Sequence, residues 1–204
     1  LAYVAGSLLH AGHSVRFIDA NALNLSKEEV LARVKRYAPD LIAMTVTTYM
    51  IHQNLSWIRY LKQNLDIPVI VGGQHLSLYP YETFAHKEID YGIIGEAEET
   101  IVDFLDALEK GEDLNKVDSI IFRDKDGKII KTGNGRTVKD LDKVPYPARE
   151  LLPNDRYFEF ITQRKNFSLF MTSRGCPYLC IYCEQGKTRF RGRTPKNVAD
   201  EIEE

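Results

Sequence analysis

Apolar residues recur with two different periods along the first half of the chain. In some stretches they recur every three or four positions, which places them on one face of a helix. Between these stretches lie short apolar runs of strand length. The sequence predicts helices over residues 1–11, 26–37, 50–65, 81–86 and 95–109, and strands over residues 14–19, 41–47, 68–73 and 91–94. Ser26 and Glu29 predict a capping box at the start of the second helix.

This alternation of helix and strand predicts an α/β domain with a doubly wound parallel sheet. Residues 41–47 are continuously apolar, as expected of a parallel strand that is buried on both faces. Such sheets bind ligands beyond the carboxyl ends of their strands, so we expect a site where three strand-to-helix loops meet. The residues of these loops are Thr45, Thr47, Thr48, Tyr49, Gly72, Gly73, Gln74, His75, Gly95 and Glu96.

Each of these residues also has a simpler interpretation. Gly72 and Gly73 let a ligand approach the backbone closely, but adjacent glycines more often form only a turn. The threonines can be ordinary β-branched strand residues, and His75 can be a rim histidine without a metal role. Glu96 and its acidic neighbours lie in the predicted first turn of a helix, where the macrodipole favours negative charge.

From residue 112 the pattern changes. Two short apolar runs joined by Asp126-Gly127 predict a β-hairpin over residues 119–131. The glycines and prolines of residues 133–147 are typical of extended connecting chain. We therefore expect residues 112–165 to be a linker that carries a small hairpin.

All three cysteines of the chain follow a further strand predicted over residues 167–172. Cys176, Cys180 and Cys183 have the spacing C-x3-C-x2-C. Three thiolates on one loop can bind a metal centre but leave a tetrahedral site one ligand short, and a 4Fe–4S cluster also normally takes four cysteines. The spacing indicates a cluster with one iron open to a ligand from outside the protein. Three unrelated thiols, or a zinc site completed by a distant residue, are the alternatives.

A last helix is predicted from an N-cap at Thr194, with Pro195 in its first position, to the end of the chain. Three arginines at alternate positions precede it, namely Arg189, Arg191 and Arg193. They can bind carboxylates or phosphates, or they can simply be solvated.

The cysteine loop resembles the signature of the radical S-adenosylmethionine (SAM) enzymes, and the likeness covers residues 167–204. The resemblance implies that Cys176, Cys180 and Cys183 each bind one iron of a 4Fe–4S cluster, while SAM binds the fourth iron. It places Tyr182 beside the adenine. It also implies that SAM is cleaved reductively to a 5′-deoxyadenosyl radical, which takes hydrogen from an unactivated carbon.

The first half resembles the cobalamin-binding domain that precedes many radical SAM domains. The likeness runs over about residues 1–111 and includes the segments V-G-G-Q-H and G-E-A-E-E-T-I. It implies that the turn at residues 45–49 and Gly72-Gly73 line the slot for the nucleotide tail of cobalamin, with His75 and Glu96 on the same rim. The first and central strand of such a domain would precede Leu1.

We therefore expect the chain to be part of a longer polypeptide. Residues 1–111 would be a flavodoxin-like domain of the cobalamin-binding type that lacks its first strand, and 112–165 the linker. Residues 166–204 would be the first β-loop-α unit of a truncated radical SAM barrel, a partial TIM barrel. The remaining barrel strands and the substrate pocket would lie beyond residue 204.

The resemblance implies an enzyme, and we favour methyl transfer to an unactivated carbon over the ring-forming reactions of some relatives. No catalytic residue is assigned. A second hypothesis keeps the radical SAM chemistry but has a cobalamin-like domain that no longer binds cobalamin. A third is a non-catalytic flavodoxin-like binding module with a zinc knuckle. A methylthiotransferase is disfavoured because no cysteine precedes Cys176.

The composition and charge of the chain limit the classes of molecule that it is expected to bind. The 204 residues are 44% hydrophobic and 27% charged, as in ordinary globular proteins, and the formal net charge of −2 gives no electrostatic case for nucleic acid. No apolar run is long enough for a membrane span, and clustered cysteines fit metal ligation in a reducing cytoplasm. We expect a cytoplasmic enzyme that acts on a small molecule and takes electrons from a flavodoxin or ferredoxin.

Overall fold

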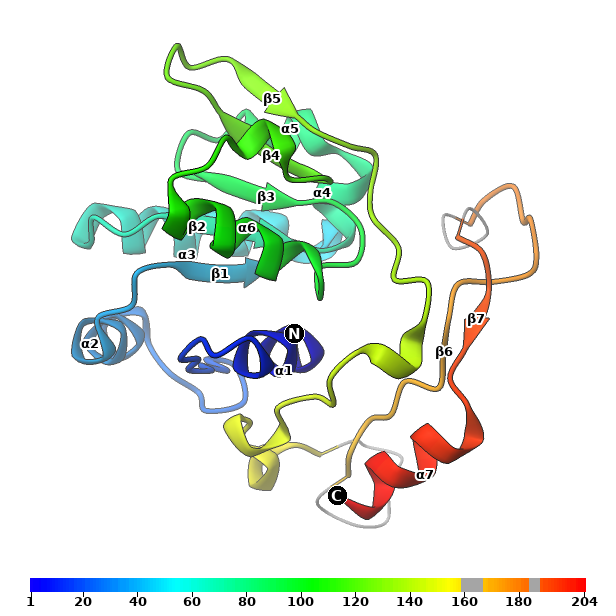
Figure 1. The fold of residues 1–204 in the computed structure, drawn as a ribbon. Helices are drawn as coiled ribbons and strands as arrows, with labels where there is room; N and C mark the ends of the chain where they lie inside the picture. Colours follow the sequence, from blue (N-terminus) through cyan, green and yellow to red (C-terminus); the bar gives the residue numbers. More distant parts are fainter. Residues whose placement is uncertain (159–166, 184–187) are drawn as a thin grey trace.

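The computed structural model describes residues 1–158, 167–183 and 188–204. Within these ranges the largest sheet has five strands in the order β1-β2-β3-β4-β5 and lies in the upper part of the view in Figure 1. Strands β1 to β3 run parallel, whereas β4 and β5 are added antiparallel. The strands are β1 (Ile42–Thr45), β2 (Val69–Gly72), β3 (Tyr91–Ile93), β4 (Ile120–Arg123) and β5 (Ile129–Lys131). The predicted α/β class with a parallel core is confirmed, and the complete sheet is mixed.

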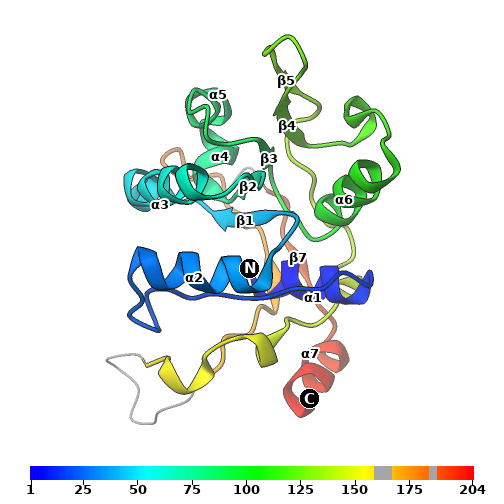
Figure 2. The same ribbon diagram turned by 90° about the vertical axis from the view of Figure 1, so that its left-hand side faces the viewer.

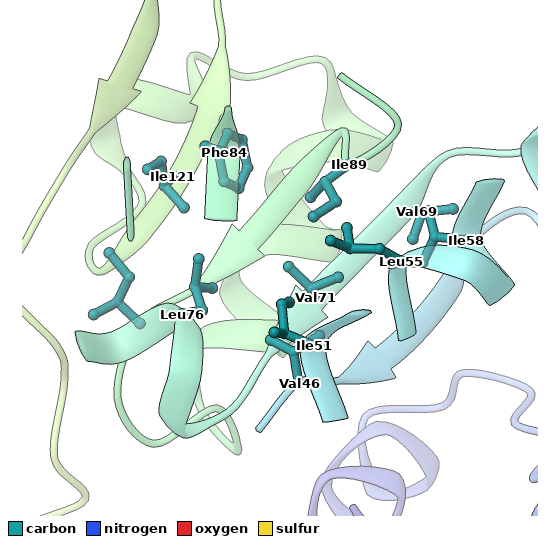
Figure 3. Packing of buried hydrophobic residues seen from close by; sticks show 11 residues of the cluster. Val46, Ile51, Leu55, Ile58, Val69, Val71, Leu76, Phe84, Ile89 and Ile121 are labelled. Atoms are coloured by element: carbon teal, nitrogen blue, oxygen red, sulfur yellow. The ribbon is translucent and has the colours of Figure 1, made fainter. Parts of the chain in front are cut away.

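One face of the sheet is covered by three helices, α3 (Ile51–Asn64), α4 (Gln74–Leu78) and α5 (Pro80–Phe84), as Figure 2 shows. Leu55 and Ile58 of α3 pack in one cluster with strand residues such as Val71, and all three are almost fully buried (Figure 3). Each such side chain contributes about 1.5–3 kcal/mol by leaving water. This apolar layer fixes the strands whose carboxyl ends form the candidate site.

The opposite face is covered by α6 (Thr100–Lys110), against which α1 (Ala2–His10) also packs. Phe104 of α6 is fully buried, and its ring centroid lies 4.9 Å from that of Tyr91. Helix α2 (Lys27–Tyr37) lies beside α3. Its predicted capping box is present, because Ser26 Oγ accepts from the Glu29 amide and the Glu29 carboxylate accepts from the Ser26 amide.

Three sequence predictions about details of the first domain are wrong. Strand β1 is not buried on both faces, because Ala43 and Thr45 are exposed. Gln74 and His75 do not lie in a loop but begin α4. Helix α6 begins at Thr100 rather than at residue 95, so the acidic residues at 96–99 precede it and do not form its first turn.

The strand predicted over residues 14–19 is wrong. All of these residues are described, and they form no strand. A strand needs a neighbour to complete its backbone hydrogen bonds, and the sheet formed by the described residues begins at β1 without pairing to this segment. The alternating pattern in the sequence therefore reports one exposed and one packed side of the segment, not a place in the sheet.

The predicted hairpin is confirmed as β4 and β5, and it does more than interrupt a linker. Strand β4 pairs with β3, so the hairpin extends the sheet of the first domain. After β5 the chain passes through three 3-10 helices between residues 141 and 156. It contacts α1 there, because the Ala148 amide donates to the Ala2 carbonyl at 3.0 Å. The described 3-10 helices are η1 (Thr48–Met50), η2 (Leu114–Lys116), η3 (Leu141–Lys143), η4 (Arg149–Leu151) and η5 (Asn154–Arg156).

The last part of the chain forms β6 (Ser173–Arg174), β7 (Arg191–Gly192) and α7 (Pro195–Glu203). The helix is confirmed, and Thr194 Oγ1 accepts from the Asn197 amide at 3.2 Å. The strand predicted over residues 167–172 is wrong, because carbonyls in this segment accept hydrogen bonds from Arg149 and Arg193 instead of from a neighbouring strand. Within the described ranges, no helix combines the length and the apolar character that a membrane span requires.

Candidate functional site

Three loops meet at the carboxyl end of the parallel strands, and hydrogen bonds join each loop to the next. The His75 amide donates to the Val46 carbonyl at 3.2 Å, which joins the loop after β2 to that after β1. Ser77 Oγ donates to the Gly73 carbonyl at 3.1 Å and accepts from the Gly95 amide at 3.0 Å. The loops that the sequence selected therefore form one continuous rim.

Gly73 makes the tightest contact in this rim. Its φ angle is +110°, and a Cβ atom there would lie 2.7 Å from the Val46 carbonyl oxygen and 2.8 Å from Thr45 Oγ1. Only glycine adopts this backbone conformation without strain. The close approach that the double glycine allows is thus made by the chain's own turn after β1.

The side chains of the rim divide into an exposed group and a buried histidine. Thr45, Thr47 and Gln74 are exposed, and Tyr49 is 94% exposed. His75 is only 3% exposed, with Nδ1 3.1 Å from Thr48 Oγ1 and its ring centroid 5.4 Å from that of Tyr79. The rim offers hydroxyl and amide groups to a ligand, and the buried His75 contacts the Thr48 hydroxyl.

Glu96 lies at the end of the rim and connects three parts of the chain. Its carboxylate accepts two hydrogen bonds from Arg191, at 2.6 and 2.9 Å, and one from the Val138 amide at 2.7 Å. Arg174 lies 3.5 Å away. Burial alone would raise the pKa of Glu96, but the hydrogen bonds from Arg191 and Val138 and the charge of Arg174 lower it overall. Glu96 is therefore held as a carboxylate.

Glu98 completes this ion-pair cluster. It is buried, and its Oε1 accepts from Arg174 Nη2 at 2.6 Å. Burial would lower the pKa of Arg174, but the hydrogen bond to Glu98 and the two nearby carboxylates raise it overall. Glu96 and Glu98 are thus ion-pair partners of distant arginines and not charges at a helix start. The sequence left open whether the arginines before the last helix bind anions or are solvated, and the structure shows Arg191 paired with Glu96 and Arg193 paired with Glu201.

These ion pairs bring the cysteine loop close to the carboxyl end of β3, since Arg174 immediately precedes Gly175-Cys176. The β6–β7 pair closes the base of the loop, and the Cys176 amide donates to the Thr188 carbonyl at 3.1 Å. A Cβ atom at Gly175, whose φ is +80°, would overlap the Arg189 carbonyl. The base of the loop is therefore tightly constrained.

The donor atoms of the loop fit a thiolate-bound cluster. Cys176, Cys180 and Cys183 are all free; Cys180 is exposed and the other two are half-buried. Tyr182 is 88% exposed. The described residues contain no group of three or more His, Cys, Asp or Glu side chains already placed to hold a metal ion. Three free thiols are the donors that the predicted centre requires, and the assignment of these cysteines as ligands stays a prediction.

Sequence reasoning missed the roles of Arg174, Glu98 and Arg191 at this edge. The only signal for them is the pair of acids at alternate positions in G-E-A-E and an arginine on each side of the cysteines. Neither segment indicates by itself that these side chains are in contact, because Glu98 and Arg174 are 76 positions apart in the sequence and Glu96 and Arg191 are 95 apart.

Comparison with known proteins gives related sequences over the whole chain. A protein described as an uncharacterized methyltransferase from Pyrococcus horikoshii is 30% identical, over 99% of this chain and 44% of its own length. Two anaerobic magnesium-protoporphyrin IX monomethyl ester cyclases are 32% identical (Rubrivivax gelatinosus) and 35% identical (Synechocystis). The alignments cover 100% and 98% of this chain, and 38% and 40% of the relatives. The chain thus spans less than half the length of these proteins.

Solved structures show the same fold. The radical SAM methyltransferase TsrM from Kitasatospora setae, with cobalamin and a 4Fe–4S cluster bound, matches all of this chain and 42% of its own with a TM-score of 0.73 at 20% identity. The cobalamin-dependent SAM radical enzyme OxsB matches 98% of this chain and 28% of its own with a TM-score of 0.77 at 20% identity.

The family model of the B12 binding domain matches residues 1–105, which is just over half of the chain. That range contains β1 to β3 and the rim at their carboxyl ends. The chain therefore belongs to the B12-binding domain family, as the resemblance of its first half predicted, and it shares the fold of these two solved structures.

Proposed function

We propose that this chain is the B12-binding domain and cysteine loop of a cobalamin-dependent radical SAM enzyme, which methylates an unactivated carbon of a small molecule. The observation that carries the proposal is the position of the cysteine loop. Its base is paired to Glu96 and Glu98, which follow the carboxyl end of β3, and α/β domains bind ligands at the carboxyl ends of their strands. A cluster and a cobalamin bound at these two places would be neighbours.

Different residues would bind the two cofactors. Cys176, Cys180 and Cys183 would hold the 4Fe–4S cluster, and the exposed ring of Tyr182 is free to stack on the adenine of SAM. When bound, the cluster with SAM supplies a radical that removes hydrogen from carbon, and cobalamin supplies the methyl group. The chain itself would orient these groups through the rim and through the constrained base of the cysteine loop.

The rim would take the nucleotide tail of cobalamin. The exposed hydroxyls of Thr45 and Thr47 and the exposed amide of Gln74 can hydrogen-bond polar groups of the tail. Gly73 permits the compact turn beneath them, and His75 orients Thr48 through the 3.1 Å contact. Glu96 is already bound to Arg191, so we assign it to the cysteine loop and not to cobalamin.

A ring-forming reaction is the second candidate. It is favoured by the two relatives at 32% and 35% identity that are named as anaerobic cyclases. Both candidates require the same cofactors, and both take an electron from a donor such as flavodoxin or ferredoxin in the cytoplasm. They differ in the product, which mass spectrometry distinguishes because methylation adds a carbon and cyclisation does not.

Anaerobic reconstitution with iron and sulfide tests the cluster. We expect a brown protein with about four irons per chain, because a cluster of this kind contains four. Replacement of Cys176, Cys180 and Cys183 by Ala should abolish iron binding. Tyr178→Ala, which changes an exposed side chain of the same loop, should retain it. A protein that binds only zinc would refute the proposal.

Added hydroxocobalamin tests the other cofactor. It should co-elute with the full-length protein on gel filtration, because hydrogen bonds already join the three loops of the rim. Bound iron together with no retained cobalamin would replace the proposal by a radical SAM enzyme whose B12-type domain has lost its ligand.

A further inference from the structure

We propose that Glu96 and Glu98 are positioning residues that fix the cysteine loop against the edge of the B12-binding domain. They do so by binding two arginines that face each other across the base of the loop. The inference rests on the proposed function only in regarding this loop as the segment that binds the cluster.

The β6–β7 pair cannot hold the loop by itself. Each strand has two residues, which is too short for an independently stable hairpin. In addition, Arg174 and Arg191 are direct partners in the ladder, and like charges placed opposite each other destabilise a strand pair. The hairpin therefore needs negative charge from outside, and Glu96 and Glu98 supply it.

The four charged groups are shielded from water. The side chains of Arg174 and Arg191 are each 12% exposed, that of Glu98 is 9% exposed and that of Glu96 is 17% exposed. Charge-assisted hydrogen bonds in such surroundings are strong, and the bidentate pair between Arg191 and Glu96 also fixes direction. The position of the loop base is thus specified by geometry as well as by attraction.

Glu96 is itself fixed in place. Its amide donates to the Arg136 carbonyl at 2.9 Å, and its carboxylate accepts from the Val138 amide. Gly95 before it is bonded to Ser77, in the rim assigned to cobalamin. One short segment therefore connects the rim to the arginines, and Cys176 lies two residues beyond Arg174.

We call the ion pairs of Glu96 and Glu98 with Arg174 and Arg191 the anchor of the cysteine loop. Hydrogen exchange in the metal-free full chain tests this anchor directly. The amides of Cys176 and Arg193 are bonded to the Thr188 and Thr172 carbonyls, so their exchange reports opening of the loop base. In the double variant E96Q/E98Q we expect exchange in the peptides that contain them to be about tenfold faster, because two shielded arginines lose their counter-charges.

Glu99→Gln is the matched control. Glu99 is adjacent in sequence and also pairs with an arginine, Arg136 at 2.6 Å, but that arginine is outside the cysteine hairpin. Exchange at the loop base should be unchanged in E99Q. Equal exchange in E96Q/E98Q and the wild type would overturn the proposal. Should E96Q/E98Q fail to fold, R191Q is measured in the same way, with the same two outcomes.

A second readout separates this inference from the proposed function. After reconstitution, E96Q/E98Q should release iron to a chelator several-fold faster than the wild type, whereas E99Q should match the wild type. Equal release rates would show that the anchor does not position the cluster. Faster exchange in a protein that never binds iron would refute the proposed function and leave the anchoring of the loop established.

Discussion

At the rim, Gly73 has a backbone conformation and a close contact that other residue types could not keep without strain. Gly73 has φ +110° and ψ −177°, a conformation that is essentially restricted to glycine. Its missing Cβ leaves room for the Val46 carbonyl, and through it for the turn that exposes Thr45 and Thr47. Local backbone geometry at one glycine thus shapes the surface that we assign to cobalamin.

Gly73→Ala should be more costly than an alanine at an unobstructed glycine. We expect it to lower the free energy of unfolding by about 2–4 kcal/mol, since backbone strain and a clash with Val46 add together. Gly111→Ala is the control, because Gly111 has φ +66° and a Cβ atom there would meet nothing within 4 Å, so only about 1 kcal/mol of left-handed strain applies. Urea denaturation measures both, and equal losses would contradict the close contact.

At the scale of elements, several extended segments are held by side chains and not by a sheet. Residues 14–19 form no strand, yet Asp19 at their end accepts a hydrogen bond from Tyr157 at 3.0 Å, across 138 residues of chain. Residues 167–172 likewise form no strand, and the Met171 carbonyl accepts a hydrogen bond from the Arg193 guanidinium at 3.2 Å. Side-chain tethers decide where these segments lie.

The tether at Tyr157 has a defined pH dependence. Burial, followed by the hydrogen bond to Asp19 and its negative charge, raises the pKa of Tyr157 from 10.0 to about 12. Since the folded state disfavours the phenolate, the stabilisation is complete below pH 10 and is lost as the pH rises toward 12.

The stability difference between the wild type and Tyr157→Phe should therefore be constant up to about pH 10 and shrink above it. Thermal denaturation at a series of pH values measures the difference, and the ultraviolet absorbance of the phenolate follows the titration. Tyr49→Phe, which alters a side chain that is 94% exposed, is the control. A difference that stays constant above pH 10 would show that the pKa of Tyr157 is not raised in the folded state.

At the scale of the whole molecule, a second carboxylate joins the two ends of the described chain. The carboxylate of Glu201 in α7 is fully buried and pairs with Arg193 and with Arg149 of η4. It also accepts from the Tyr3 hydroxyl of α1 at 3.2 Å. The connecting chain packs closely here, because a Cβ atom at Gly6 would overlap the Tyr146 carbonyl. Helix α7 is thereby fixed to the first domain.

Glu201→Ala should destabilise the protein strongly. It leaves Arg193, whose side chain is 4% exposed, without its carboxylate, and we expect a loss of about 3–5 kcal/mol. Asp200→Ala, one residue earlier in α7, removes only an exposed pair with Lys196 and should cost less than about 1 kcal/mol. Chemical denaturation of the full chain compares the two, and similar losses would argue against a buried cluster.

The sequence by itself determined what depends on neighbouring residues. The capping box at Ser26 and Glu29, the hairpin turn at Asp126-Gly127 and the helix N-cap at Thr194 are local interactions, and each was predicted correctly. The alternation of helix and strand gave the α/β class, because the periods of 3.6 and 2 are properties of one element at a time. The cysteine spacing is also a local property, and it predicts a set of three thiolate donors on one loop.

The tertiary structure decided what depends on partners far along the chain. Whether an alternating segment such as 14–19 becomes a strand depends on a neighbour for its backbone hydrogen bonds, which its own residues cannot specify. Glu96 and Glu98 had the composition of a helix start, and only the fold brings them to Arg174 and Arg191. Shielded ion pairs form where the packed chain excludes water, so the anchor of the cysteine loop is a property of the assembled molecule.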